Sequence, residues 1–271
     1  MRISKAARLA CSLCALFCFS TSLHAQSEED LAKQLANPIA SLISVPIELM
    51  YDDGFGADGN GTQTTFVLKP VIPFSISEDW NVISRSIIPF VFQDDFQPAP
   101  SQNGLADVIQ SFFFSPKQPT AGGVTWGVGP VFQIPFDVFA LSDNRPGRNE
   151  WGVGLTGVAL KQTGPWTFGI LANHIWGVES SAMSQSDTFL QPFASYTTPN
   201  AWTFAVNSES TYDWEREQWL TPINFKVSKL VSIGDQRVSL HAIARNWATA
   251  PEGGPDGWGG TIGLTLLFPK G

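Results

Sequence analysis

Residues 65–93 read TFVLKPVIPFSISEDWNVISRSIIPFVFQ and form two runs of alternating side chains, separated by the polar turn SED at 77–79. In the first run every even-numbered position from Phe66 to Ile76 is apolar. In the second run the even-numbered set begins with Trp80 and ends with Phe92. An alternation with a period of two predicts β-strands. The stretch therefore predicts an antiparallel hairpin of two long strands.

The length and charge of this hairpin favour a strand pair that crosses a membrane. Each run is at least as long as the roughly 9–11 residues with which a tilted strand spans a bilayer. If the odd-numbered set faced lipid, Arg85 would lie near the bilayer centre at a cost of about 2–4 kcal/mol. The even-numbered set is therefore the predicted lipid face. Because lipid tolerates no unpaired strand edge, the rest of the chain is expected to close a barrel.

Residues 1–25 are predicted to be a signal peptide. Arg2, Lys5 and Arg8 form a positive start, residues 9–19 form a short apolar core, and cleavage is expected near Ala25. All three cysteines, at positions 11, 14 and 18, lie in this segment, so the mature chain is expected to contain no thiol or disulfide chemistry. The domain prediction is a signal peptide at 1–25, a periplasmic or lumenal segment at 26–38, and a barrel at 39–271.

The charge and composition exclude other classes of protein. The mature chain keeps 13 basic and 24 acidic residues, a net charge of −11, which argues against a nucleic-acid partner. No run after the signal approaches 18 apolar residues, so the sequence does not predict spanning helices. Ten Trp and 20 Phe are typical of an all-β protein.

The same alternation continues along the chain, after a predicted helix at residues 28–36. The expected strands are 42–51, 65–76, 80–93, 107–115, 125–136, 151–161, 166–176, 188–197, 202–212, 219–228, 237–247 and 258–268. The fold prediction is thus an all-β, transmembrane antiparallel β-barrel of about 12 strands. Long and short connections broadly alternate, starting with a long one, which predicts that both termini are periplasmic. Two connections weaken this pattern, because 213–218 is short for an outer loop and 229–236 is long for an inner turn.

The tryptophans support the barrel, whereas the prolines do not. Four tryptophans begin strands just after predicted periplasmic turns: Trp80, Trp126, Trp166 and Trp202. The other six flank predicted outer loops: Trp151, Trp176, Trp214, Trp219, Trp247 and Trp258. Two such belts are typical of interfacial aromatic girdles.

Eight prolines fall within predicted strands, where each removes a ladder hydrogen bond: Pro46, Pro70, Pro73, Pro89, Pro130, Pro135, Pro192 and Pro222.

Several segments carry a resemblance to a known family. They are LAKQLANP at 31–38, QSFFFSP at 110–116, ANHIW at 172–176, ESTYDW at 209–214 and LLFP at 266–269. The chain resembles a family of proteobacterial outer-membrane proteins described as transporters, some of which carry the label neuromedin U. It is more distantly similar to outer-membrane proteins of the meta-cleavage pathway of phenol degradation. The resemblance implies a channel in the Gram-negative outer membrane for small solutes, hydrophobic or aromatic ones included, and it supplies no site residues.

The last strand also resembles the C-terminal assembly signal of barrels. Ile262, Leu264, Leu266 and Phe268 share one parity, although the chain continues for three residues beyond the aromatic one. The expected partners are therefore the barrel-assembly machinery, outer-membrane lipid and a small-molecule solute.

Charged residues on the polar parity are the candidate lumen-lining residues. They are Glu48, Lys69, Arg85, Glu209, Lys226, His241 and Arg245. One interpretation is that opposite charges pair and brace the lumen, and the other is that they line a solute path. Because Glu209 and Lys226 lie on adjacent predicted strands, we expect them to form an ion pair.

The sequence predicts no enzyme, cofactor or metal site. The mature chain has only two histidines, and although His174 adjoins Asn173, no spaced Ser/His/Asn constellation marks a catalytic triad. Asp52, Asp53 and Asp58 miss the EF-hand spacing and are interpreted as turn residues. The preferred function is passive uptake of small solutes. The alternatives are a structural or adhesive barrel with a plugged lumen and, less favoured, an outer-membrane hydrolase.

Overall fold

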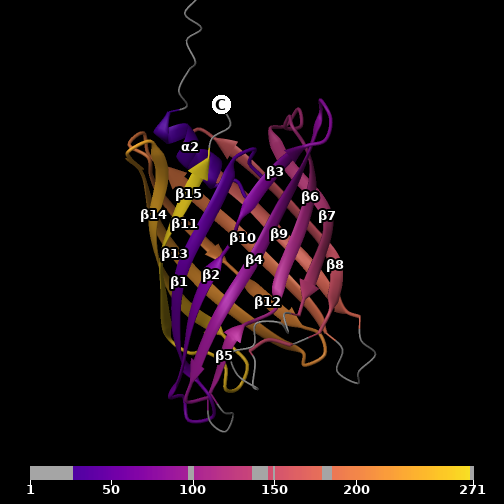
Figure 1. Ribbon diagram of the computed structural model, residues 1–271, viewed down its shortest axis with the longest axis vertical. Helices are drawn as coiled ribbons and strands as arrows, with labels where there is room; N and C mark the ends of the chain where they lie inside the picture. Colours follow the sequence, from indigo (N-terminus) through magenta and orange to yellow (C-terminus); the bar gives the residue numbers. More distant parts are fainter. Residues whose placement is uncertain (1–26, 97–100, 136–145, 149, 179–184, 269–271) are drawn as a thin grey trace, which may run out of the picture.

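The computed structural model describes residues 27–96, 101–135, 146–148, 150–178 and 185–268, and it shows one sheet closed on itself (Figure 1). The predicted signal peptide lies outside these residues. The strands are β1 (Ile43–Phe55), β2 (Gly61–Leu68), β3 (Val71–Ser75), β4 (Trp80–Asp94), β5 (Gln102–Leu105), β6 (Val108–Pro116), β7 (Val124–Ile134), β8 (Gly152–Thr163), β9 (Trp166–Gly177), β10 (Ser186–Thr197), β11 (Trp202–Ser208), β12 (Ser210–Asp213), β13 (Gln218–Ile233), β14 (Gln236–Thr249) and β15 (Trp258–Phe268). All pairings are antiparallel, and β1 pairs with β15 to close the cylinder.

Three strands of the barrel are each interrupted once, so the described segments form twelve strands. β2 and β3 both pair with β4, as do β5 and β6. β11 and β12 both pair with β10 and β13. The prediction of a twelve-stranded antiparallel barrel is confirmed.

A proline on the neighbouring strand lies opposite each interruption. In the register of the flanking pairs, Pro46 faces Lys69 and Pro222 faces Glu209, while Pro89 accepts a hydrogen bond from the amide of Ala106 at 2.9 Å. Proline has no N–H to donate, so the carbonyl across from it loses its ladder partner and the strand is interrupted there. These three prolines therefore account for the three interruptions, which the sequence did not predict.

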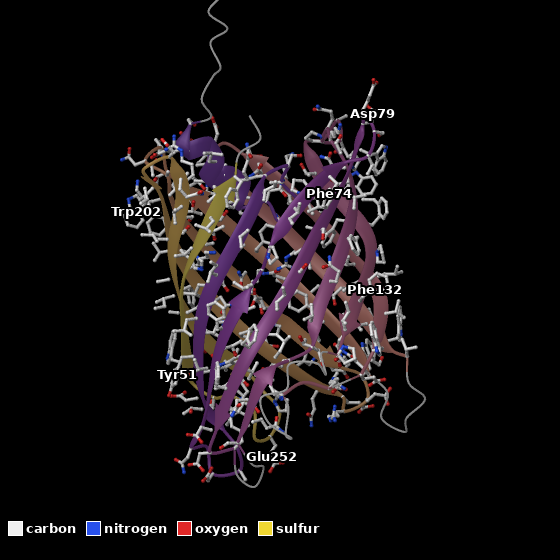
Figure 2. All side chains as sticks on the ribbon, in the orientation of Figure 1. Tyr51, Phe74, Asp79, Phe132, Trp202 and Glu252 are labelled. Atoms are coloured by element: carbon white, nitrogen blue, oxygen red, sulfur yellow. The ribbon has the colours of Figure 1, made fainter. Side chains whose placement is uncertain are left out.

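The side chains alternate between the outside of the barrel and its lumen. Tyr51 and Phe74 point outward and are about half exposed, whereas Val67 and Ile83 point inward and are buried (Figure 2). Exposed apolar side chains from strands all around the cylinder form the outer band that a transmembrane barrel presents to lipid. Trp202 is one of the aromatic residues near one rim of this band. The predicted parity of residues 65–93 is confirmed.

Helix α2 (Glu28–Leu35) lies across one mouth of the barrel, at the end where β1 begins and β15 finishes (Figure 1). Its N-cap Ser27 accepts a hydrogen bond from the amide of Asp30 at 3.0 Å. The buried face of the helix packs on the segment that follows it, on the turn before β11 and on strands β13 and β15: Leu31 and Ala32 pack against Ala40, Leu42, Ala201, Leu230 and Leu267. Farther along, Ile39 packs against the inward-facing Ile83 and Phe113. The N-terminal segment thus covers this mouth, where the sequence had left its position open.

Two expected boundaries were wrong. Residues 102–105 form β5, although the sequence predicted a loop there, because they pair with the far end of β4. β13 and β14 extend toward each other until only Gly234 and Asp235 connect them, with Gly234 at φ 60°. The connection at 229–236, which the sequence predicted to be long for an inner turn, is therefore a tight turn. The turns around Asp79 and Gly234 lie at the same end as α2, and Glu252 lies in a loop at the opposite end (Figure 2).

Among the described residues, no helix has the length and apolar character needed to cross a membrane.

Candidate functional site

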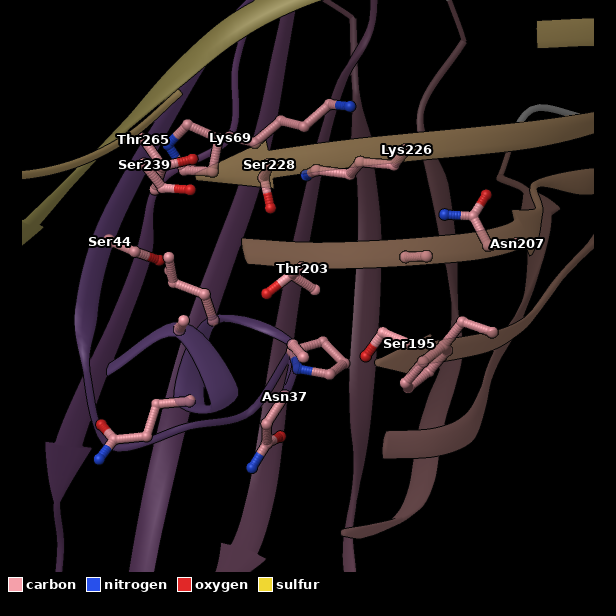
Figure 3. A pocket seen from close by; sticks show the side chains of 18 of the residues that line it. Asn37, Ser44, Lys69, Ser195, Thr203, Asn207, Lys226, Ser228, Ser239 and Thr265 are labelled. Carbon is pink, nitrogen blue, oxygen red and sulfur yellow. The ribbon is translucent and has the colours of Figure 1, made fainter. Parts of the chain in front are cut away.

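A cavity of about 240 Å³ lies inside the barrel, below the N-terminal segment. The segment supplies Leu35, Asn37 and Leu42, and the strands supply a ring of inward-facing side chains. Figure 3 shows small polar residues on this ring, among them Ser44, Ser195, Thr203, Ser228, Ser239 and Thr265. These polar side chains alternate with the outward apolar set, so the same period of two produces both the lipid face and a wet interior.

Glu48 on β1 is the anionic centre of the largest charged group at the cavity. Its carboxylate accepts a hydrogen bond from Lys69 Nζ at 2.7 Å and lies 3.1 Å from His241 Nε2. Lys69 is free to reach it because the break between β2 and β3 falls at this position. His241 is buried behind Glu48 and does not line the cavity itself.

Arg245 on β14 forms a second buried ion pair, with Asp52 on β1. Its Nη1 donates to both carboxylate oxygens of Asp52, at 2.9 and 2.7 Å. Trp247 Nε1 also donates to Asp52, and Arg245 Nε donates to Asn224 at 3.1 Å. Both charged side chains of this group are therefore hydrogen-bonded, and the group links β1 and β14 on the lumen side of the wall.

Glycines on β15 let the Arg245–Asp52 ion pair and the His241–Glu48 contact cross that strand. Gly259 pairs with Arg245, and Gly263 pairs with both His241 and Glu48. A Cβ on Gly259 would overlap the Asp52 carboxylate and lie 2.8 Å from the carbonyl oxygen of Tyr51. A Cβ on Gly263 would lie 2.6 Å from His241 Nε2. Only glycine leaves room for side chains from the two flanking strands to meet over β15.

The expected ion pair between Glu209 and Lys226 is not formed, and this prediction was wrong. Glu209 accepts a hydrogen bond from Gln191 Nε2 at 3.0 Å instead. Lys226 pairs in register with Ala205, four residues from Glu209 along its strand. At about 3.3 Å per residue, this separation keeps the two charges at different heights in the lumen. Lys226 lines the cavity and, within the described residues, makes no hydrogen bond or ion pair.

The structure brings most of the seven candidate residues to one place. Six line the cavity: Glu48, Lys69, Arg85, Glu209, Lys226 and Arg245. The sequence missed Asp52, which it interpreted as a turn residue. Because Asp52 shares the parity of Glu48, the alternation could have placed it in the lumen. Gln191 and Asn224 were also missed, since no charge singled them out.

A separate polar network lies near the opposite rim, around Arg148. Its guanidinium bonds Asp187 at 2.9 Å and Asp213 at 2.8 Å, and its backbone amide bonds Asp107 at 2.8 Å. The network ties a loop residue to strands β10 and β12 and to the break between β5 and β6. Because the aspartates of this network accept hydrogen bonds from arginine and amide donors, we interpret the network as holding the loop at Arg148 in place rather than as a binding site.

The histidine considered for catalysis lies away from the lumen. His174 has the outward parity of β9. Its ring centroid lies 4.3 Å from that of Trp176, with the rings tilted by 52°, and its Nδ1 is hydrogen-bonded to the Thr188 hydroxyl at 2.7 Å. Asn173 has the opposite parity, so the two neighbours cannot act on one substrate. Asp58 bonds Asn60 within its own loop, as turn chemistry predicts. In the described ranges no group of three His, Cys, Asp or Glu side chains is placed to hold a metal ion.

Comparison with known proteins reveals a shared fold. No family model and no curated protein matches the chain. Among solved structures, it is similar to the COG4313 outer membrane channel from Pseudomonas putida F1, with a TM-score of 0.65 and 13% identity over 84% of this chain and 96% of that chain. The two share one barrel fold. The β domain of the Bordetella autotransporter BrkA matches at a TM-score of 0.45, with 8% identity over 84% of this chain and 100% of that chain. A porin structure matches at 0.40, with 9% identity over 84% and 99%.

Proposed function

We propose that this protein is a β-barrel channel of the Gram-negative outer membrane that admits small solutes passively. The observation that supports the proposal best is the contrast between the two faces of the wall. Apolar side chains cover the outside, while charged and hydroxyl side chains surround a cavity of about 240 Å³ inside. A twelve-stranded barrel is wider than the eight-stranded kind that side chains fill, and narrower than a porin of 16–18 strands. A barrel of this intermediate width suits the selective passage of small molecules.

The proposal includes an orientation. We propose that residues 1–25 are removed as a signal peptide and that the mouth covered by α2 faces the periplasm, with both termini there. In support, the strand ends at that mouth are joined by tight turns such as residues 234–235, and periplasmic turns of such barrels are short. The pairing of β15 with β1 also fits insertion by the barrel-assembly machinery through the C-terminal strand.

The rival function is a structural or adhesive barrel that conducts nothing. The position of α2 across one mouth favours this rival, because the helix and residues 36–42 narrow the lumen. The test is a recording of purified full-length protein in a planar bilayer, paired with swelling of liposomes in small sugars and amino acids. Discrete current steps and solute-dependent swelling would support the channel. A protein that inserts, resists heat on unheated gels and yet passes neither ions nor solutes would be the plugged barrel instead.

A further inference from the structure

Charges at the cavity do not balance, although the protein as a whole is acidic. Three cations, Lys69, Arg85 and Lys226, face two carboxylates, Glu48 and Glu209. The remaining cation of the lining, Arg245, is neutralised by Asp52. One positive charge is therefore left over inside a protein whose formal net charge is −8. Charges that leave bulk water are costly unless they are paired, so this excess favours a bound anion.

The excess is carried by two side chains without bonded partners. Glu48 is occupied by Lys69 and His241, and Glu209 accepts from Gln191. Within the described residues, neither the side chain of Arg85 nor that of Lys226 makes a hydrogen bond or an ion pair, while both line the cavity. Each interacts electrostatically with Glu48 and Glu209 without forming an ion pair with either.

The two cations approach the cavity from well-separated parts of the wall. Arg85 lies on β4 and Lys226 on β13, and the strands β14, β15, β1 and the β2–β3 strand separate them around the ring. Figure 3 shows Lys226 extending into the cavity beside Lys69. Both side chains thus face one cavity from different strands. Hydrogen bonds from Arg or Lys to a carboxylate are among the strong ones, so an anion of this kind suits them.

Several apolar side chains lie among the hydroxyl and amide groups of the lining: Leu42, Val71, Phe193, Leu230 and Ile243. A ligand that fits this cavity has a single negative charge at one end and an apolar body at the other. We infer that the cavity binds a small organic monocarboxylate, with its carboxylate between Arg85 and Lys226 and its body against these apolar residues. The inference rests on the proposed channel function and names the class of solute for it.

Calorimetric titration of the full-length protein in detergent tests the inference, with hexanoate as the probe and the heat of empty micelles subtracted. Hexan-1-ol and hexylamine have the same apolar body without the negative charge. We expect hexanoate to bind the wild type at least tenfold more tightly than either analogue. Lys226→Met keeps the apolar stem and removes the charge, and it should weaken hexanoate at least tenfold. Arg85→Gln is the second variant, in case the first fails to fold. Lys161→Met removes an exposed cation near the mouth and should change nothing.

The outcomes separate the inference from the function on which it rests. If the wild type conducts ions but binds hexanoate no better than hexan-1-ol, the inference is wrong and the channel stands. Equal affinity for hexanoate in the wild type and in both variants would also overturn it. If acetate binds as tightly as hexanoate, the site is a general anion site and the apolar half of the inference is wrong. Tight, Lys226-dependent binding without any conductance would support the site and contradict the channel.

Discussion

Arg245 and Asp52 form an ion pair that passes over the strand lying between them, with both oxygens of Asp52 accepting from Arg245 Nη1. The arginine is on β14, the aspartate is on β1, and their contacts of 2.9 and 2.7 Å cross β15 at Gly259. Both side chains are almost completely buried. Loss of one partner from such a pair leaves a charge without compensation, which typically costs about 3–5 kcal/mol.

The first prediction follows from this burial. Asp52→Asn should lower the temperature at which the folded band disappears on unheated gels, by far more than a surface change does. Arg237→Met is the matched control, since Arg237 pairs with Glu28 at the exposed mouth, where a salt bridge contributes about 0–1 kcal/mol. If both variants unfold at the same temperature, the pair over β15 adds no stability of its own.

The second prediction concerns the glycine beneath that pair. Gly259→Ala should destabilise the barrel by about 1–3 kcal/mol, the usual range for overpacking, because the added methyl group displaces Asp52 and presses on the carbonyl of Tyr51. Gly260→Ala is an ideal comparison, because a Cβ there meets nothing closer than 3.8 Å. Urea unfolding in detergent measures both variants. Equal unfolding midpoints for the two would show that β15 yields to the larger residue.

The third prediction concerns the helix at the mouth. Leu31→Ala should weaken docking of α2 by about 2–5 kcal/mol, since Leu31 is buried against the barrel. A helix that leaves the mouth more often should raise the mean current through the channel in a planar bilayer. Glu29→Ala, on the exposed side of the same helix, should leave the current unchanged. An unchanged current in Leu31→Ala would place the narrowest point elsewhere.

The fourth prediction concerns ion selectivity. Lys226→Ala removes a cation from the cavity and leaves Glu48 and Glu209 in place, so the reversal potential in a salt gradient should shift toward cations. Because Lys226 has no bonded partner among the described residues, heat resistance should barely change. A large loss of heat resistance with unaltered selectivity would instead make Lys226 a structural support.

The fifth prediction uses the absence of cysteine from the chain after residue 18. In intact membranes, a water-soluble maleimide should label Lys226→Cys through the lumen and should not label Phe132→Cys, which points outward (Figure 2). Asp79→Cys, in an exposed turn, is the positive control for reagent access. Labelling at position 132 together with silence at 226 would reverse the assignment of faces.

Sequence alone predicted the number of strands and the lipid-facing parity of residues 65–93, since a period of two is a local property. Arg85 was assigned to the lumen simply because lipid would not accept it. The height of a side chain in the barrel was harder to predict, because it depends on register. Glu209 and Lys226 share a face on adjacent strands, yet four residues of offset keep them apart. Likewise, the interruption at Lys69 follows from Pro46 on another strand, which only the pairing reveals.

The two side-chain contacts over β15 have a consequence for how this protein is made. Asp52 and Glu48 belong to the first strand to emerge from synthesis, while Arg245 and His241 belong to the last strand but one. Their contacts need β15 in place between β1 and β14, so they exist only once the final seam has joined. In an unfinished sheet Glu48 can already bind Lys69, but Asp52 and Arg245 lack each other. Closure of the cylinder therefore also neutralises this buried pair, and an intermediate without the seam carries two uncompensated charges that the finished barrel does not.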